Sequence, residues 1–279
     1  MILNRMKHIL TTFISIFVIS LGQAEKASQT ALAKAGDNRS ELEAFISAAK
    51  KTHGDFGHRA AVFLVEGMPE SDLKQLDREF LTENLDLAMK ARAEFPWCAK
   101  LPEELFFNDV LPYASLDETR ESWRPEFYEK CRKLVAKAAT PTEAVQALNS
   151  QLFNLINVHY NTGRKKPNQS PSESIAQSRA TCTGLSIILV DACRSVGVAA
   201  RVVGTPLWTS KRGNHTWTEI WDDGWLFTGS DDANIKMWCA HTGYLQHTCR
   251  GHLGEIAEMD VSPCNKYLVR AQSRSTRTR

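Results

Sequence analysis

Residues 180–204 read ATCTGLSIILVDACRSVGVAARVVG. Apolar residues recur at helical spacing between Thr181 and Val196, which predicts an amphipathic helix. Gly197 follows at a position where glycine commonly ends a helix, and the apolar run 198–203 then predicts a β-strand. The predicted apolar face of the helix consists of Leu185, Ile188, Leu189, Ala192 and Val196.

Cys182 lies in the first turn of this predicted helix. Unpaired backbone N–H groups and the helix dipole stabilise a thiolate at such a position. A thiolate is the nucleophile that attacks an amide carbonyl. The alternative is a buried cysteine that packs as a small apolar side chain.

Residues 216–228 predict two strands around Asp223-Gly224, a strong hairpin-turn signal. If these two residues form the turn, Asp222 faces Trp225 and His215 faces Asp232. A carboxylate opposite the imidazole would fix its tautomer, as the third member of a catalytic triad does. The alternatives are a surface histidine at a strand end and a polar turn at Asp231 and Asp232.

Two segments carry a resemblance to the transglutaminase-like, papain-like cysteine enzymes. Residues 180–204 resemble the nucleophile helix and the strand after it, and NHTWTEIWDDGW, residues 214–225, resembles the histidine hairpin. RAEFPW (92–97) and NDVLPYAS (108–115) are similar to the helical N-terminal half of bacterial secreted members. The resemblance extends over about residues 55–229. It implies an α+β fold, a helical half followed by a nucleophile helix packed on an antiparallel sheet.

The resemblance also implies the roles of site residues. Cys182 would be the nucleophile and His215 its base, while Asp232, Asp231 or another group would complete the triad. The family's aspartate usually falls one or two residues earlier, near Gly229 or Ser230. Gln177 and Trp208 are candidate donors to an oxyanion, although a loop glutamine and a core tryptophan are simpler interpretations.

A second resemblance begins at Thr228. TGSDDANIKMW (228–238), HTG (241–243) and RGHLGEI (250–256) resemble one WD40 repeat, similar to those of bromodomain and WD-repeat proteins. In such a repeat Asp232 would have a structural role, which competes with the catalytic one. One repeat is too little for a propeller. We therefore expect a fusion near Thr228 and an incomplete β tail.

The N-terminus has the layout of a secretory signal peptide, with basic residues before the apolar run 9–21 and small residues at 22–24. We expect cleavage near Glu25, and a secreted or periplasmic protein without stable membrane association afterwards.

Helices are expected over 41–92, with a start near Ser71-Asp72, and over 125–160. An irregular aromatic-rich connection (95–112) and a loop (161–174) are expected between helices. The expected domains are 1–24 (signal), 25–150 (helical), 151–229 (core) and 230–279 (WD40-like).

Composition limits the function classes. Lys and Arg number 34 against 32 Asp and Glu, a balance that does not favour nucleic acid as a partner. Seven cysteines without CxxC spacing suggest no zinc site, and an odd count leaves at least one free thiol. No cofactor is expected, and the expected partner is a protein or peptide substrate.

Two functions fit these observations. One is a cysteine-dependent hydrolase or acyltransferase that acts on amide or peptide bonds through a thioester. The alternative is an inactive, truncated transglutaminase-like domain that acts as a binding protein with a WD40-like tail.

Overall fold

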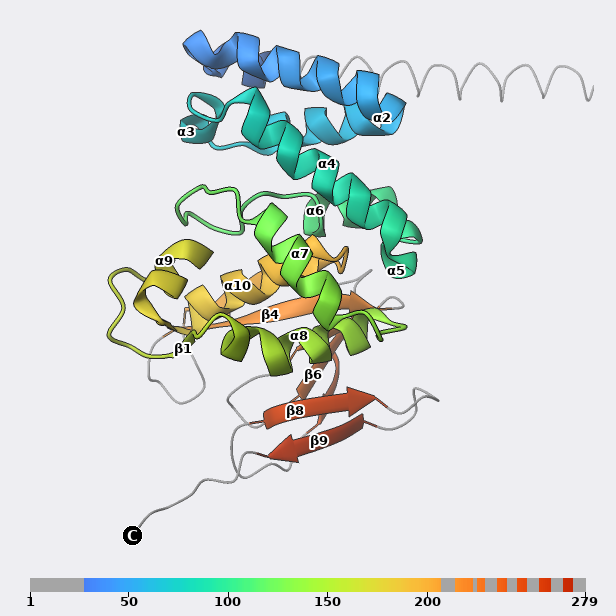
Figure 1. The fold of residues 1–279 in the computed structure, drawn as a ribbon, viewed down its shortest axis with the longest axis vertical. Coiled ribbons are helices and arrows are strands. Elements are labelled where there is room, and N and C mark those ends of the chain that lie inside the picture. The colour runs from blue at the N-terminus through green and yellow to red at the C-terminus, as the bar shows by residue number, and fades with distance from the viewer. Residues whose placement is uncertain are drawn as a thin grey trace, which may run out of the picture. The chain divides into compact units, whose positions relative to one another are not determined.

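A computed structural model gives the fold (Figure 1). Two compact units divide the chain, Met1–Leu85 and Asp86–Arg279. Helices dominate the first, and the second combines helices with an antiparallel sheet, so the predicted α+β class is confirmed. The structure describes residues 28–206, 214–222, 225–228, 235–239, 245–249, 256–261 and 268–272.

The first unit contains the short helix η1 (Gly36–Asn38), α2 (Arg39–Gly67), α3 (Glu70–Leu73) and the start of α4 (Arg78–Glu94). The prediction of a single helix from Ser71-Asp72 onward is wrong, because α3 ends at Leu73 and a new helix, α4, begins at Arg78. The Asn38 amide donates to the carbonyls of Leu73 and Leu76 at 2.9 and 2.8 Å. Asp77 accepts a 2.8 Å bond from the Phe80 N–H, so it caps the new helix.

The expected irregular connection at 95–112 contains two short helices instead, α5 (Pro96–Ala99) and α6 (Glu103–Asp109). Each has a proline at its beginning, at N1 in α5 and at the N-cap in α6. A proline is compatible with a helix start, where its missing N–H would have had no partner in the helix.

Side-chain caps define the starts of the next helices, one of which was predicted and one of which was not. After α7 (Arg124–Leu134), α8 (Pro141–Leu155) begins at the predicted Thr140, whose side chain accepts from the Glu143 N–H. The loop expected over 161–174 ends earlier, because α9 (Pro171–Gln177) starts with a capping box between Ser170 and Glu173. A small parallel pair flanks that loop and helix, β1 (His159–Tyr160) with β2 (Arg179–Ala180).

The main sheet has the order β3-β4-β5-β6-β7 and is antiparallel throughout. Asp222 pairs with Trp225, so the predicted register of the β4–β5 hairpin is confirmed. The Asp222 carboxylate accepts bonds from the N–H and hydroxyl of Thr142, at the start of α8. The strands are β3 (Ala200–Thr205), β4 (His215–Asp222), β5 (Trp225–Thr228), β6 (Ile235–Cys239) and β7 (Leu245–Cys249).

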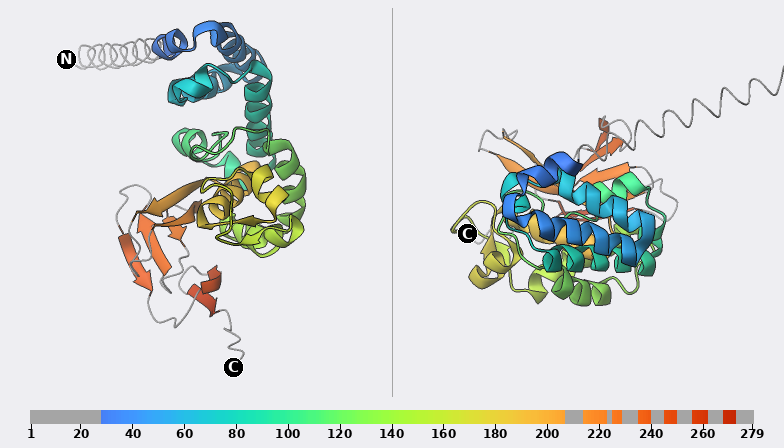
Figure 2. Two further views of the ribbon diagram at one scale, coloured as in Figure 1. Left: turned by 90° about the vertical axis from the view of Figure 1, so that its left-hand side faces the viewer. Right: turned by 90° about the horizontal axis from the view of Figure 1, so that it is seen from above.

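The sheet continues through the expected fusion point. β5 pairs with β4 on one side and with β6 on the other, so the WD40-like segment supplies the fourth and fifth strands. A separate hairpin joins β8 (Ile256–Val261) to β9 (Leu268–Gln272). Figure 2 shows the strands of the main sheet gathered on one side of helices α7, α8 and α10.

Helix α10 (Cys182–Ser195) follows the predicted boundaries and runs beside β4 (Figure 1). It contacts α7 and α8 as well as β3 and β4. Burial does not follow the predicted apolar face: Leu185 and Leu189 are half-buried, while the polar Asp191, Arg194 and Ser195 are buried. The cause is packing on several sides, which leaves no solvent face for these polar residues.

Two buried arginines hold residues 109–115 against α10. Arg124 donates to the carbonyls of Val110, Leu111 and Pro112 and to that of Arg194. Arg194 donates to further carbonyls of the same segment, including those of Asp109 and Ala114. Burial lowers the pKa of Arg124 to about 9, with repulsion from Arg194 as a second cause. These carbonyl bonds offset part of the cost of burying two guanidinium groups.

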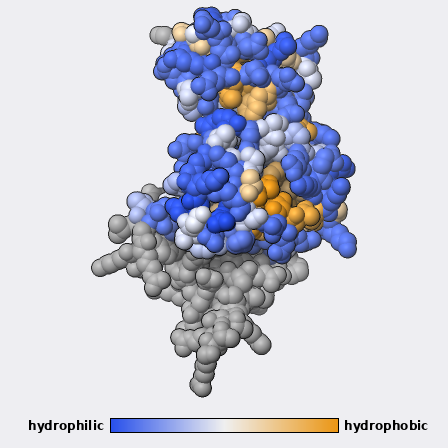
Figure 3. All heavy atoms as spheres, turned by 60° about the vertical axis from the view of Figure 1, so that its left-hand side comes forward, coloured by the Kyte–Doolittle hydropathy of each residue, from blue (hydrophilic) through white to orange (hydrophobic). Residues whose placement is uncertain are grey.

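On the face drawn in Figure 3, hydrophilic residues cover most of the described surface, with apolar areas between them. Within the described ranges, no helix has both the length and the apolar character that crossing a membrane requires.

A first prediction concerns Gly197, which ends α10 with φ of +71°. A Cβ there would lie 2.5 Å from Cys98 Cβ and 2.8 Å from its Sγ. We expect Gly197→Ala to lower the free energy of unfolding by about 2–5 kcal/mol, from positive-φ strain and overpacking. Gly67→Ala is the control, because its Cβ would meet nothing within 4 Å. Equal denaturation midpoints for the two variants would contradict the packing argument.

A second prediction concerns Asp191, which is 1% exposed and whose carboxylate oxygens have no hydrogen-bond partner. Burial raises its pKa well above the ordinary value, while Arg194 and Arg124 oppose the shift and Glu118 and Glu121 add to it. The folded protein therefore keeps the proton while the unfolded chain loses it above about pH 4. The stability that this carboxyl contributes is thus greatest at low pH and falls as pH rises.

We therefore expect Asp191→Asn to stabilise the protein more at pH 8 than at pH 5, measured by urea unfolding. Asp55→Asn, on the exposed surface of α2, is the matched substitution and should show no such pH-dependent gain. A larger loss of stability at pH 8 than at pH 5 would instead mean that the arginines stabilise an ionised Asp191.

Candidate active site

Cys182 is the first residue of α10, as predicted, and its side chain is half-buried. Thr181 is the N-cap in extended conformation, and its carbonyl accepts the first helical bond, from Leu185 N–H. The N–H groups of a helix's first turn lack partners within the helix. The start of α10 can therefore stabilise negative charge on the Cys182 sulfur or on an oxygen bound beside it.

The first turn of α10 is packed closely on the preceding segment. A Cβ on Gly184 would lie 2.9 Å from the Ala180 Cβ and 3.5 Å from the Ser174 Oγ. The glycine therefore permits the approach of α9 and β2 to the start of α10. This contact fixes where Cys182 lies.

His215 is the first residue of β4, and contacts between α10 and β4 bring it to the end where Cys182 lies. The Thr183 and Thr216 hydroxyls are hydrogen-bonded at 3.1 Å and buried. One step along, the Thr218 hydroxyl donates to the Ser186 carbonyl at 3.4 Å. The first residues of α10 and the first residues of β4 therefore lie side by side. The direct neighbours of Cys182 and His215 touch, while the pairing of their own side chains stays a prediction.

The side chain of His215 belongs to the opposite face of the sheet. Because side chains alternate along a strand, Thr216 and Thr218 face α10, whereas His215 and Trp217 face away from it. The His215 and Trp217 rings are stacked, with centroids 6.1 Å apart and an interplanar angle of 24°. His215 also ends the β3–β4 ladder, where it pairs with Thr205.

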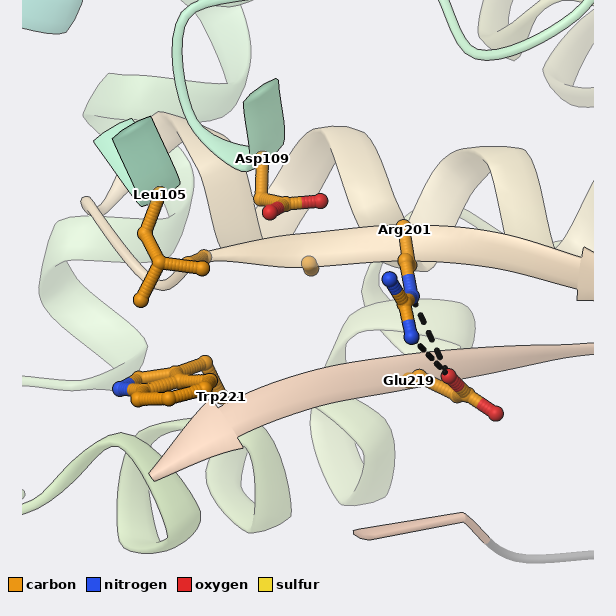
Figure 4. A pocket seen from close by; sticks show the side chains of 7 residues that line it. Leu105, Asp109, Arg201, Glu219 and Trp221 are labelled. Atoms are coloured by element: carbon orange, nitrogen blue, oxygen red, sulfur yellow. Dashed lines mark hydrogen bonds and ion pairs between the residues drawn. The ribbon is translucent and has the colours of Figure 1, made fainter. Parts of the chain in front are cut away.

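The same face of the sheet carries a small hollow at the far end of β4 (Figure 4). Glu219 and Trp221 lie on this face, and Arg201 on β3 forms an ion pair with Glu219 at 3.0 Å. Asp109 enters from the end of α6, and burial raises the pKa of its carboxyl. The hollow is lined by Leu105, Asp109, Ala199, Ala200, Arg201, Glu219 and Trp221.

The structure shows the hydrogen-bond partners of one oxyanion candidate, Gln177. The Gln177 carboxamide is used locally, because it donates to the Glu173 carbonyl at 2.8 Å and accepts from the Lys165 N–H at 3.2 Å. Gln169, which the sequence reasoning missed, is 1% exposed and donates to the Ser174 hydroxyl and the Arg179 carbonyl. Its side chain thus links the loop to the segment before Cys182. No local pattern marks it, since its partners come from packing.

Several predicted features lie outside the described residues. They are Trp208, Asp231, Asp232 and the signal segment 1–24. The third member of the triad and the site of cleavage therefore stay predictions.

Cys98, Cys131 and Cys193 are buried free thiols. Burial raises the pKa of Cys98 and Cys131 to about 12 and raises that of Cys193 as well. Among Cys98, Cys131, Cys182 and Cys193, Cys182 thus has the most accessible side chain. Across the described ranges, no group of three or more His, Cys, Asp or Glu side chains is placed to hold a metal ion.

Comparison with protein families identifies this part of the chain. Residues 129–229 match the Transglutaminase-like superfamily. The match includes Cys182 and His215 and covers less than half of the chain. The chain therefore contains a segment that is similar to the transglutaminase-like superfamily.

Shorter matches connect the chain to WD-repeat proteins. A bromodomain and WD repeat-containing protein of Dictyostelium discoideum is 47% identical over 47 residues, 17% of this chain and 2% of that protein. An F-box/WD repeat-containing protein of Caenorhabditis elegans is 40% identical over 53 residues, which are 19% of this chain and 9% of that protein. Autophagy-related protein 16 of Arabidopsis thaliana is also 40% identical over 53 residues, 19% of this chain and 10% of its own. The chain spans a tenth or less of each relative, so the WD40-like tail stays a prediction.

One solved structure, a "Putative Cysteine Protease" from Cytophaga hutchinsonii, aligns with 56% of this chain and 50% of its own. The sequences are 18% identical, and the TM-score is 0.37.

A third prediction concerns the reactivity of the thiols. In native protein treated briefly with iodoacetamide near neutral pH, we expect Cys182 to be alkylated at least about tenfold faster than Cys98, Cys131 or Cys193. The reason is that burial keeps those three thiols protonated and covered, whereas Cys182 is accessible at a helix start. Peptide mass spectrometry after a time course measures each rate.

The variant His215→Gln should slow alkylation of Cys182 while leaving the melting temperature within a few degrees. Alkylation of Cys182 at the rate of Cys193, in folded protein, would count against an activated thiol.

Proposed function

We propose that the second unit is an exported cysteine-dependent hydrolase or acyltransferase that acts on amide or peptide bonds, with Cys182 as nucleophile and His215 as base. The observation that supports it most is the buried Thr183–Thr216 hydroxyl contact, because it holds the starts of α10 and β4 together. The transglutaminase-like match over residues 129–229 supports the same reading. Export rests on the sequence of the N-terminal segment.

The reaction we propose proceeds in two halves. The Cys182 thiolate attacks the amide carbonyl carbon, and the oxyanion is stabilised by the N–H groups at the start of α10. The C–N bond then breaks, His215 gives its proton to the leaving amine, and a thioester remains. Water, deprotonated by His215, attacks the thioester and releases the acid together with the Cys182 thiolate. An amine in place of water gives transamidation.

Asp232 would orient the His215 imidazole, and Asp231 is the alternative. Both depend on the β4–β5 pairing continuing past Thr228, where the described part of β5 ends. The proposed partner is a protein or peptide substrate, with neither nucleic acid nor membrane as a stable partner. The chemistry needs no cofactor.

A binding protein without activity is the second candidate. It is favoured by the junction at Thr228, where a WD40-like segment pairs with β5 and continues the sheet of the core. Under this proposal Asp232 has a structural role and the core carries no turnover. The two candidates differ in whether Cys182 is needed for catalysis.

The fourth prediction separates them. We expect Cys182→Ala to lower hydrolysis of casein or of fluorogenic peptide amides by at least about 10³-fold, because it removes the nucleophile. Cys193→Ala, in the same helix but buried, is the matched control and should retain turnover. Circular dichroism and thermal melting establish that both variants fold. Turnover that survives in folded Cys182→Ala would end the enzyme proposal.

A further inference from the structure

The stacked Trp217 is held by two further side chains on the face of the sheet away from α10. Its indole Nε1–H donates to Glu219 Oε1 at 3.2 Å. Arg201, on the neighbouring strand β3, donates from Nε and Nη2 to Glu219 Oε2 at 3.2 and 3.0 Å (Figure 4). The four side chains therefore form a continuous chain of contacts from Arg201 through Glu219 and Trp217 to His215.

We propose that Trp217 is a positioning residue for His215, and that Glu219 and Arg201 hold its indole in place. The inference rests on the proposed function, because it assigns a role to residues behind the proposed base. It extends the site from a cysteine and a histidine to a supporting row along β4 and β3.

The geometry gives each member a task. A ring stacked on the imidazole restricts its rotation, so that the imidazole plane stays fixed while protons move to and from it. The bond to Glu219 removes the freedom of the indole to turn away. Aromatic contacts of this kind change rates by about 2- to 10-fold when they are lost from the reacting arrangement.

Glu219 is 4% exposed, an unusual location for a carboxylate. Its two oxygens have different partners, Trp217 on one and Arg201 on the other. Arg201 is half-exposed, with 48% of its side chain accessible, so it keeps contact with water while it balances the buried charge. These bonds fix the orientation of the Glu219 carboxylate, and the carboxylate in turn fixes the orientation of the Trp217 indole that donates to it.

Trp221 provides the matched control. It lies on the same strand and the same face, four residues from Trp217, and lines the hollow beside Leu105 (Figure 4). Substitution at either position removes an indole from this face of β4. An effect on His215 alone should follow Trp217, whereas a general loss of packing should follow both.

The fifth prediction uses the variants Trp217→Leu, Trp217→Phe, Trp221→Leu and Trp221→Phe in the full chain. We measure the rate of Cys182 alkylation by iodoacetamide, and kcat and KM on a peptide amide that the wild type hydrolyses. Trp217→Leu should lower the alkylation rate and kcat by about 5- to 10-fold and leave KM within about 2-fold. Trp217→Phe keeps an aromatic face and should retain more activity, and both Trp221 variants should remain within about 2-fold of wild type.

The Glu219 variants test the anchor. Glu219→Gln keeps an oxygen acceptor for the indole N–H and should retain more activity than Glu219→Ala. Melting temperatures identify any variant that does not fold, and in that case the Phe and Gln variants decide the question. Equal losses for Trp217 and Trp221 variants, or a change confined to KM, would overturn the positioning role.

The outcomes also distinguish the inference from the function on which it rests. If Cys182→Ala retains turnover, or Cys182 alkylation is independent of His215, the proposed function fails and the positioning role falls with it. If turnover needs Cys182 and alkylation needs His215, but Trp217→Leu behaves like Trp221→Leu, only the positioning role fails.

Discussion

The burial of α10 among α7, α8 and the strands β3 and β4 is the constraint on which the second unit depends. Ile187, Ile188, Val190 and Cys193 have no exposed surface, so the helix cannot shift without opening the core. Both ends of α10 are fixed by specific contacts. Thr183 joins its start to β4, and the Trp97 indole donates to the Val196 carbonyl at its end. Cys182 gains its fixed position from this arrangement.

Polar burial is the consequence of placing a helix of this sequence in the centre. Arg194 and Asp191 cannot reach water, and the free-energy cost of burying their charges is reduced in different ways. Arg194 has carbonyl partners in residues 109–115, whereas the Asp191 carboxylate has no hydrogen bond and its pKa rises with burial. Arg124 adds a second guanidinium to the same carbonyls. The two buried arginines thus join α10 to residues 109–115 through backbone carbonyls.

The transglutaminase-like core and the strands after Thr228 share one sheet. An antiparallel sheet is extended by backbone pairing, which requires little of the added sequence beyond a suitable strand. This explains how a segment resembling another family can follow β5 without a break in the ladder. It also leaves the described β4–β5 pairing four residues long, between Glu219 and Thr228 at one end and Asp222 and Trp225 at the other.

Features that depend on local chemistry could be predicted from the amino-acid sequence. The start of α10 at Cys182, its end at Gly197, the Thr140 cap and the Asp222–Trp225 register all follow from residues within a few positions of one another. Helix breaks and the α9 capping box were also local signals, and were missed. Packing between elements determines which polar side chains are buried, which partners Gln169 has, and how the side chains from Arg201 to His215 come together. Contacts such as Arg201–Glu219, 18 residues apart, and Trp97–Val196, 99 apart, depend on how elements pack, and no pattern along the chain encodes them.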